Sequence, residues 1–252
     1  MPIEAFSSDL ISTLVRCVED AVGDDIQADI RRNGLQTHNS VPSRIWDLLN
    51  TNIINSLETE DCTIAKAHRG PWEMLIIFEK TSQCIITFMR EKRFLELQRR
   101  QQQRKRMHYI DILTKQFNGS LLSSQQQLSF IPHKFSDEGN LKELVQNLLI
   151  DLGSDRNIVR HHVLVLFNTV GYQLTQIRAV MVTPSLDIVC ESEQDWSSFI
   201  KAEESVVVDT IENSFSPGNQ PGRGLSLTAK AIARKKEKPQ KKSSEKDTSK
   251  EV

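Results

Sequence analysis

The sequence predicts an α+β protein with N-terminal helices, two antiparallel β-meanders separated by helices, and a disordered basic C-terminal tail. Two observations support this class. The spacing of apolar residues changes along the chain from the period of a helix to short β-branched runs, and then repeats this change. The blocks follow the order helices, strands, helices, strands, whereas a parallel α/β sheet requires strands and helices in alternation.

The first block is helical. Residues 8–22 place apolar side chains at helical spacing directly after serines that can cap a helix N-terminus. A short polar helix is expected over 25–32, and Asn33-Gly34 ends it. A third helix begins at Ser40 and carries the apolar face that includes Trp46.

Three strands are expected next. Residues 62–67 alternate weakly between apolar and polar side chains, whereas 72–78 and 84–89 are continuous apolar runs rich in β-branched and aromatic residues. Arg69-Gly70-Pro71 separates the first strand from the second. We interpret the three as a meander.

The second helical block begins with the run 90–108, which contains neither Gly nor Pro and is predicted to be helical. The helix either continues or restarts at 107–117, where an apolar stripe ends at Asn118-Gly119. A Gln- and Ser-rich connection covers 121–134. Ser136 then begins a helix that Gly153 ends.

The second meander is expected from strands at 162–167, 172–182 and 186–190, with a short helix at 195–200 and a further element at 206–211. The two meanders can share one sheet or form two lobes, since the periodicity does not decide between them. We therefore expect one α+β domain over residues 1–215. If it is two-lobed, the boundary lies near 119–135.

Charge is segregated along the chain. The formal net charge is −1, but the run 90–108 has eight basic and two acidic residues, a charge of +6. From Pro217 onward there are ten basic and four acidic residues, also a charge of +6. Residues 1–216, which include the basic run, therefore carry −7. The stretch 216–252 is rich in Pro, Gly, Lys and Ser and is predicted to be a disordered tail, because it has too little apolar surface to offset ordering.

We expect a cytoplasmic protein. No apolar run is long enough for a transmembrane helix, and the first residues lack the basic and apolar regions of a signal peptide, so we expect no membrane association. Four scattered cysteines, Cys17, Cys62, Cys84 and Cys190, are typical of reduced residues in the protein interior.

No catalytic motif identifies a reaction. Phosphate-binding glycine loops, the nucleophile elbow and the zinc-protease motif are all missing from the sequence. His161 and His162 are adjacent on a predicted strand and would point to opposite faces, so they cannot share a metal. We therefore expect no catalytic residue, metal site or cofactor. A metal-dependent nuclease is the enzymatic alternative, with Glu73, Glu79 and Glu91 as its nearest acids.

The basic run is the strongest functional signal. On one continuous helix, seven-residue spacing would align Lys92, Arg99 and Arg106 in one row and Arg93 and Arg100 in the next, over roughly 21 Å. Arginine predominates, which favours bidentate contacts with phosphate. We therefore expect a non-enzymatic nucleic-acid-associated protein that binds the backbone of DNA or RNA. Its expected contacts are Lys92, Arg93, Arg99, Arg100, Arg104 and Arg106.

Two other interpretations remain open. The acidic remainder of the chain could pair with the basic helix, leaving no external partner. Alternatively, the helix could dock an acidic protein in a toxin–antitoxin, defence or regulatory pair. In that case we expect the apolar tail residues Leu225, Leu227 and Ile232, with Arg234, to fold on the partner. The sequence does not predict an oligomeric state.

Four stretches carry a family resemblance: 44–52, 88–94, 160–167 and 177–182. Together they resemble a bacterial and phage family of unknown function. The resemblance covers about residues 1–200 and excludes the tail. It implies a bacterial or phage origin and a mobile-element or defence context, and it assigns no role to any residue.

Overall fold

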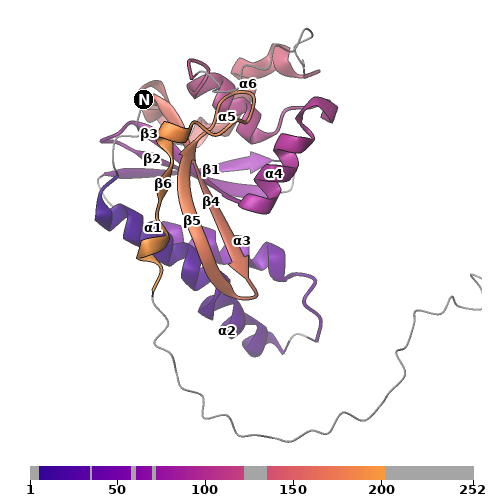
Figure 1. The fold of residues 1–252 in the computed structure, drawn as a ribbon, viewed down its shortest axis with the longest axis vertical. Coiled ribbons are helices and arrows are strands. Elements are labelled where there is room, and N and C mark those ends of the chain that lie inside the picture. Colours follow the sequence, from indigo (N-terminus) through magenta and orange to yellow (C-terminus); the bar gives the residue numbers. More distant parts are fainter. Residues whose placement is uncertain (1–5, 35, 58–60, 70–71, 122–134, 202–252) are drawn as a thin grey trace, which may run out of the picture. The chain divides into compact units, whose positions relative to one another are not determined.

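One six-stranded sheet organises the protein. The computed structural model describes residues 6–34, 36–57, 61–69, 72–121 and 135–201 (Figure 1). The strands lie in the order in which they occur in the chain: β1 (Cys62–Arg69), β2 (Trp72–Glu79), β3 (Cys84–Arg90), β4 (His161–Val170), β5 (Gln173–Met181) and β6 (Gln194–Asp195). The predicted α+β class is confirmed, and the two meanders share a single sheet.

The two meanders join through one parallel pairing. Every neighbouring pair is antiparallel except β3 and β4, which run in the same direction from Cys84↔His161 to Arg90↔Phe167. Two neighbouring parallel strands need a crossover connection that returns the chain to the end of the sheet at which the first strand began. The second helical block is that connection: α4 (Glu91–Arg99), α5 (Tyr109–Phe117) and α6 (Leu141–Leu148).

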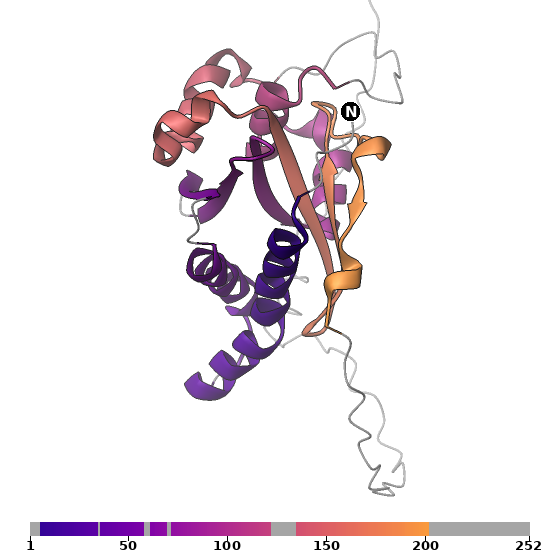
Figure 2. The ribbon, with the colours of Figure 1, turned by 90° about the vertical axis from the view of Figure 1, so that its left-hand side faces the viewer.

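Helices cover both faces of the sheet (Figures 1 and 2). On one face, α1 (Ser8–Val22) and α3 (Val41–Ser56) pack against the strands, and α2 (Asp24–Asn33) follows α1. On the other face lie α4, α5 and α6. Consecutive strand residues point to opposite faces, so Ile77 and Ile86 join the first core while Ile76 and Ile85 join the second. This explains the continuous apolar runs, since both faces are buried.

The expected helix ends of the N-terminal block are largely confirmed. The Ser7 hydroxyl accepts a hydrogen bond from the Leu10 amide at 3.2 Å, which caps α1. Gly34 closes α2 with φ +57°, a conformation that glycine adopts without a steric penalty.

The expectation of one long basic helix is wrong. Arg90 belongs to β3, α4 ends at Arg99, and the short 3₁₀ helix η1 (Gln101–Gln103) follows it. α4 buries Phe94 and Leu97, but no apolar side chain follows until Met107, so a longer helix would gain no packing. A new helix, α5, begins at Tyr109 after a cap formed by His108.

Later boundaries also differ from expectation. η2 (Glu138–Asn140) precedes α6, which starts at Leu141 rather than Ser136 and ends at Leu148, and η3 (Ile150–Asn157) follows it through the expected helix end at Gly153. The strand expected at 186–190 is only a bridge between Val182 and Ile188. Pro184 initiates a turn there, in which Leu186 has φ +61°. The chain then passes through η4 (Cys190–Ser192) to β6, and the helix expected at 195–200 is η5 (Ser197–Phe199). The element expected at 206–211 lies outside the described residues.

The Asn118 side chain fastens the crossover to the sheet. Its amide nitrogen donates to the carbonyl oxygens of His162 at 2.8 Å and Val182 at 3.0 Å. Its oxygen accepts from the His162 amide at 3.0 Å. Asn118 is fully buried and directly follows α5. One side chain therefore joins α5 to β4 and to the residue that follows β5.

His162 forms a second buried polar contact. Its Nε2 lies 2.8 Å from the hydroxyl oxygen of Thr87 on β3, and both side chains are fully buried. Burial disfavours the charged imidazolium and lowers the pKa of His162 from 6.5 to about 3. His162 is therefore neutral in the folded protein near pH 7.

We expect Asn118→Ala to lower the free energy of unfolding by about 2–4 kcal/mol, because it leaves three buried main-chain groups without partners. Urea denaturation measures the change. Asn157→Ala, at an exposed asparagine, is the control and should have little effect. Equal stability of the two variants would contradict the role given to Asn118.

We expect stability to fall as the pH drops below 6.5. In that range the unfolded chain binds a proton at His162, while the folded chain does not until about pH 3. Between pH 7 and pH 5 this linkage amounts to about 2 kcal/mol. Denaturation midpoints of the wild type and His162→Gln across this range measure it. The variant should show a flatter dependence on pH, and identical slopes would contradict the assignment.

Candidate functional site

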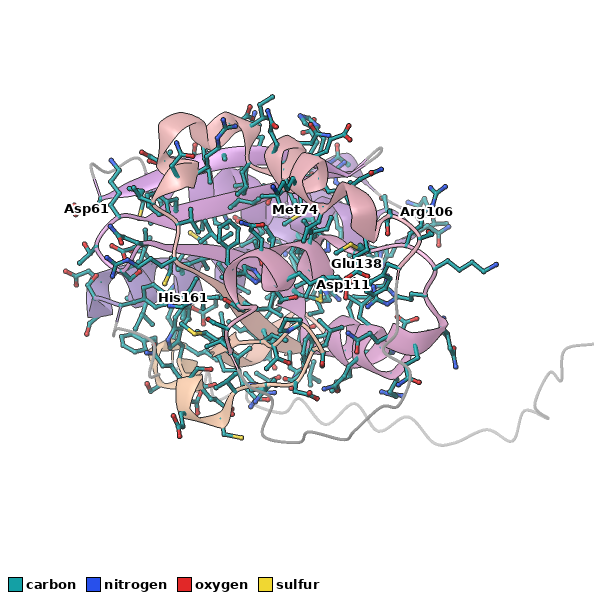
Figure 3. All side chains as sticks on the ribbon, turned by 90° about the horizontal axis from the view of Figure 1, so that it is seen from above. Asp61, Met74, Arg106, Asp111, Glu138 and His161 are labelled. Atoms are coloured by element: carbon teal, nitrogen blue, oxygen red, sulfur yellow. The ribbon has the colours of Figure 1, made fainter. Side chains whose placement is uncertain are left out.

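The basic residues from Lys92 to Arg106 form a segment along α4, η1 and the turn before α5. We call it the basic segment. Lys92 and Arg99 lie on the same side of α4 and are exposed, while Lys105 and Arg106 lie exposed in the turn. Figure 3 shows Arg106 at the outer edge of the molecule. The row expected from Lys92 to Arg106 therefore has its first two members on one helix, and the third follows a bend.

Ion pairs engage part of this segment. Arg104 pairs with Asp111, whose side chain is fully buried and also accepts from the His108 amide at 2.7 Å. Arg104 therefore fixes the start of α5. Arg93 and Arg100 share Glu96 on their own helix, at 2.7 and 3.3 Å.

The other basic side chains of the segment have no ion-pair partner among the described residues. In the part of the chain that the structure describes, the side chains of Lys92, Arg99, Lys105 and Arg106 make no ion pair. Among the described residues, the interpretation in which the protein's own acids pair with the basic run therefore applies to Arg93, Arg100 and Arg104.

Two glutamines of the basic segment form hydrogen bonds within the fold. The Gln98 amide donates to the Leu186 carbonyl at 2.9 Å, and the Gln101 amide donates to the Pro184 carbonyl at 3.0 Å. These bonds hold the end of α4 and η1 against the turn after β5. Gln102 and Gln103 are exposed.

Beside the basic segment the sheet opens between β2 and β3. The two strands pair at only three positions, from Glu79↔Cys84 to Ile77↔Ile86. Past this point β2 stays paired with β1, and β3 stays paired with β4 as far as Arg90. The backbones of 73–76 and 87–90 therefore have no strand partner on the sides that face the opening. A cavity of about 430 Å³ lies there.

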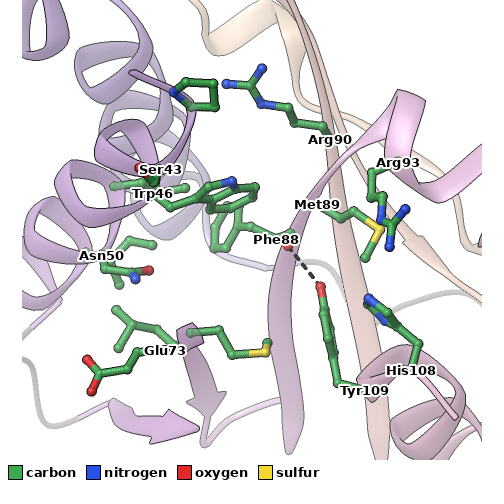
Figure 4. Close-up of a pocket in the computed structure, with 15 residues that line it drawn as sticks. Ser43, Trp46, Asn50, Glu73, Phe88, Met89, Arg90, Arg93, His108 and Tyr109 are labelled. Carbon is green, nitrogen blue, oxygen red and sulfur yellow. Dashed lines mark hydrogen bonds between the residues drawn. The ribbon is translucent and has the colours of Figure 1, made fainter. Parts of the chain in front are cut away.

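Residues from both faces of the sheet line this cavity (Figure 4). Trp46 projects from α3, and its ring lies edge-on to Phe167 with the centroids 5.8 Å apart. Tyr109 lines it from α5 and donates its hydroxyl hydrogen to the Phe88 carbonyl at 3.3 Å. The middle of the cavity is apolar, with Leu75 and Met89 among its lining residues.

The polar groups of the cavity are divided between its two sides. Figure 4 shows Arg90 extending from the end of β3 toward Ser43 at the start of α3, and Arg93 standing on the first turn of α4. Asn50 and Glu73 line the side of the cavity away from these arginines. One side therefore offers guanidinium groups, and the other offers an amide and a carboxylate.

Arg90 is half-buried and makes no ion pair or side-chain hydrogen bond among the described residues. Burial lowers the pKa of its guanidinium from the usual range, because the charged form is partly removed from water. An anion placed in the cavity would offset this cost.

The acids considered for a nuclease do not converge. The Glu79 carboxylate accepts hydrogen bonds from the Thr81 and Ser82 amides in the turn before β3, and these bonds outweigh desolvation and lower its pKa. Glu91 pairs with Arg178, and Glu73 is exposed. Within the described ranges, no three His, Cys, Asp or Glu residues are grouped so that they could hold a metal ion.

The tail residues expected to fold on a protein partner, Leu225, Leu227, Ile232 and Arg234, are not among the described residues. Two aromatic residues lie in or next to the basic segment. Phe94, on α4, is fully buried, whereas Tyr109 lines the cavity. No described helix is both long and apolar enough to cross a membrane.

Comparison with known families supplies one match. The family of unknown function DUF5986 matches residues 4–245. The chain belongs to this family. The DUF5986 match extends beyond residue 200, so it includes most of the stretch that sequence analysis set apart as a tail. No curated protein and no solved structure matches the chain.

No motif in the sequence marks the cavity. Trp46, Arg90 and Tyr109 are separated in the chain and belong to three elements, so no motif joins them. Arg90 did carry one signal: it is the first charged residue after the apolar run 84–89. A charged residue at the carboxyl end of a buried strand commonly lies where ligands bind.

We expect Arg90→Met to leave the free energy of unfolding unchanged or to raise it by up to about 1 kcal/mol, since the variant removes an unpaired, half-buried charge. The matched control is Arg178→Met, which breaks ion pairs with Glu91 and Glu193 and should cost about 2 kcal/mol. Urea denaturation of both variants measures the difference. An equal loss in both would mean that Arg90 has a partner within the protein.

Proposed function

We propose that this DUF5986 protein is a non-enzymatic nucleic-acid-associated protein whose basic segment contacts the phosphate backbone of DNA or RNA. The observation that carries the proposal is the set of exposed cations, Lys92, Arg99, Lys105 and Arg106, without ion pairs among the described residues. Basic side chains in this state are hydrated and associated with mobile counter-ions. Phosphates can replace those counter-ions, and their release favours binding.

The arrangement of the cations suits an extended polyanion. Lys92 and Arg99 are separated by two turns of α4, roughly 10 Å along the helix axis. Arg93 and Arg100 form a neighbouring row on the same helix, where Glu96 screens them in part. Arg106 extends the basic surface beyond η1. The proposed contacts are therefore Lys92, Arg93, Arg99, Arg100, Lys105 and Arg106, whereas Arg104 is assigned to the fold.

A bacterial or phage origin remains part of the proposal. An acidic protein in a toxin–antitoxin or regulatory pair would use the same cations, and no contact in the structure favours it over nucleic acid. The two partners differ in one measurable property: complexes with nucleic acid are destroyed by nuclease, whereas a complex with an acidic protein survives.

We expect the triple variant Lys92→Gln, Arg99→Gln, Arg106→Gln to bind single-stranded nucleic acid more weakly and with less dependence on salt. Each lost phosphate contact lowers the slope of log affinity against log salt by about 0.7, so three lower it by about 2. Fluorescence anisotropy with labelled strands over a range of salt concentrations measures both quantities.

The control is Arg16→Gln, Arg31→Gln, Arg32→Gln, which removes three exposed arginines from α1 and α2. This variant has the same net charge change and should keep the wild-type slope. The proposal is overturned if the wild type shows no salt-dependent binding, or if the two triple variants bind alike.

A further inference from the structure

We propose that the cavity between β2 and β3 receives one unstacked nucleobase, with its phosphate on the side of Arg90 and Arg93. This inference rests on the proposed function and deepens it: the protein would bind single strands rather than duplexes. The ligand is a nucleotide unit, which could come either from a strand that follows the basic segment or from a free mononucleotide.

The cavity has the size and walls that a base requires. Its volume of about 430 Å³ falls within the usual range of ligand pockets, roughly 300–1,000 Å³. Trp46 and Tyr109 enter from opposite faces of the sheet and offer aromatic rings, and the residues between them are apolar. Recognition of single-stranded nucleic acid relies on such rings, because every base has a face that can stack.

The arginines fix which way a nucleotide would lie. Arg90 is half-buried without an ion pair among the described residues, and Arg93 belongs to the first turn of the basic segment, so an anion is favoured on this side. The Glu73 carboxylate repels phosphate on the other side. There, Glu73 and Asn50 can accept hydrogen bonds from the amino or imino groups of a base edge.

Continuity with the basic segment supports a strand as the source. Arg93 belongs both to the rim of the cavity and to the row of α4 that includes Arg100. Of the two acids on α4, Glu91 is paired with Arg178 and Glu96 with Arg93 and Arg100, so a backbone that follows α4 reaches the cavity without meeting an unpaired carboxylate on that helix. An unpaired base at this point can leave the strand and enter the cavity, whereas a base held in a duplex cannot.

Two other cavities do not combine arginines with aromatic and apolar walls in this way. One of about 460 Å³, between the start of α1 and the β2–β3 turn, is lined by Asp9, Asp61 and Glu79. Another of about 380 Å³, between α1, α2 and α3, contains Asp20 and Asp25 with a single arginine, Arg16. Acidic linings of this kind disfavour phosphate. Of these three cavities, the one between β2 and β3 has the charge best suited to a phosphate.

The test compares Trp46→Leu with the wild type. Leucine keeps an apolar side chain on α3 but removes the stacking surface. We expect the affinity for short labelled single strands to fall by roughly 5- to 100-fold, with the salt slope unchanged. Affinity for a duplex of the same sequence should not change. The control is Phe199→Leu, at a half-buried aromatic that packs against the same core but does not line the cavity.

Arg90→Met supplies a second variant that does not depend on an aromatic packing contact. It should also weaken single-strand binding more than duplex binding, and circular dichroism verifies that both variants are folded. If Trp46→Leu and Arg90→Met bind single strands as the wild type does, the inference is overturned. If the triple variant of the basic segment is then still impaired, the proposed function stands without it.

Titration with the four ribonucleoside monophosphates distinguishes the sources. Quenching of tryptophan fluorescence by a monophosphate, lost in Arg90→Met, would show that the cavity holds a free nucleotide. No response to monophosphates, together with a Trp46-dependent affinity for strands, would show that the nucleotide must be part of a strand. No response to either probe in the wild type would overturn the inference, and the proposed function would fall with it only if a duplex does not bind either.

Discussion

β3 and β4 run in the same direction, and this one parallel pairing determines where the rest of the second helical block can lie. The chain leaves the C-terminal end of β3 at Arg90. It must return to the end of the sheet at which β3 began before it can start β4. α4, α5 and α6 make that return across one face, and Asn118 fastens the end of α5 to His162 and Val182. The basic segment and the Tyr109 side of the cavity are thus placed by the same crossover.

The opening of the sheet follows from unequal pairing. β1 and β2 are paired from one end to the other, whereas β2 and β3 share only three pairs next to their connecting turn. The β1–β2 hairpin therefore behaves as one unit that diverges from β3 toward Arg90. Main-chain groups without a strand partner are costly when buried. The hydroxyl of Tyr109 satisfies one of them, the Phe88 carbonyl, and the cavity gives others access to solvent or ligand.

Local signals in the sequence predicted much of this fold. Apolar runs located the main strands, and Asn33-Gly34 and Asn118 marked helix ends. The parallel pairing was not predictable, because nothing local distinguishes one sheet from two lobes. The helix predicted for the basic run was too long: Arg and Gln have high helix propensity, but no apolar side chain lies between Leu97 and Met107 to bury against the sheet. The cavity was missed because it depends on how α3, β3 and α5 meet in three dimensions.

The basic segment is anchored at both ends. At its start, Glu91 pairs with Arg178 of β5, across the intervening β4, and at its end Arg104 pairs with the buried Asp111. Between these anchors, Gln98 and Gln101 hold the chain to the turn at 184–186. The backbone that carries the cations is therefore ordered when the protein folds. A ligand would meet a preformed array and would need to immobilise only the ends of long side chains, so less conformational entropy is lost on association than with a flexible basic loop.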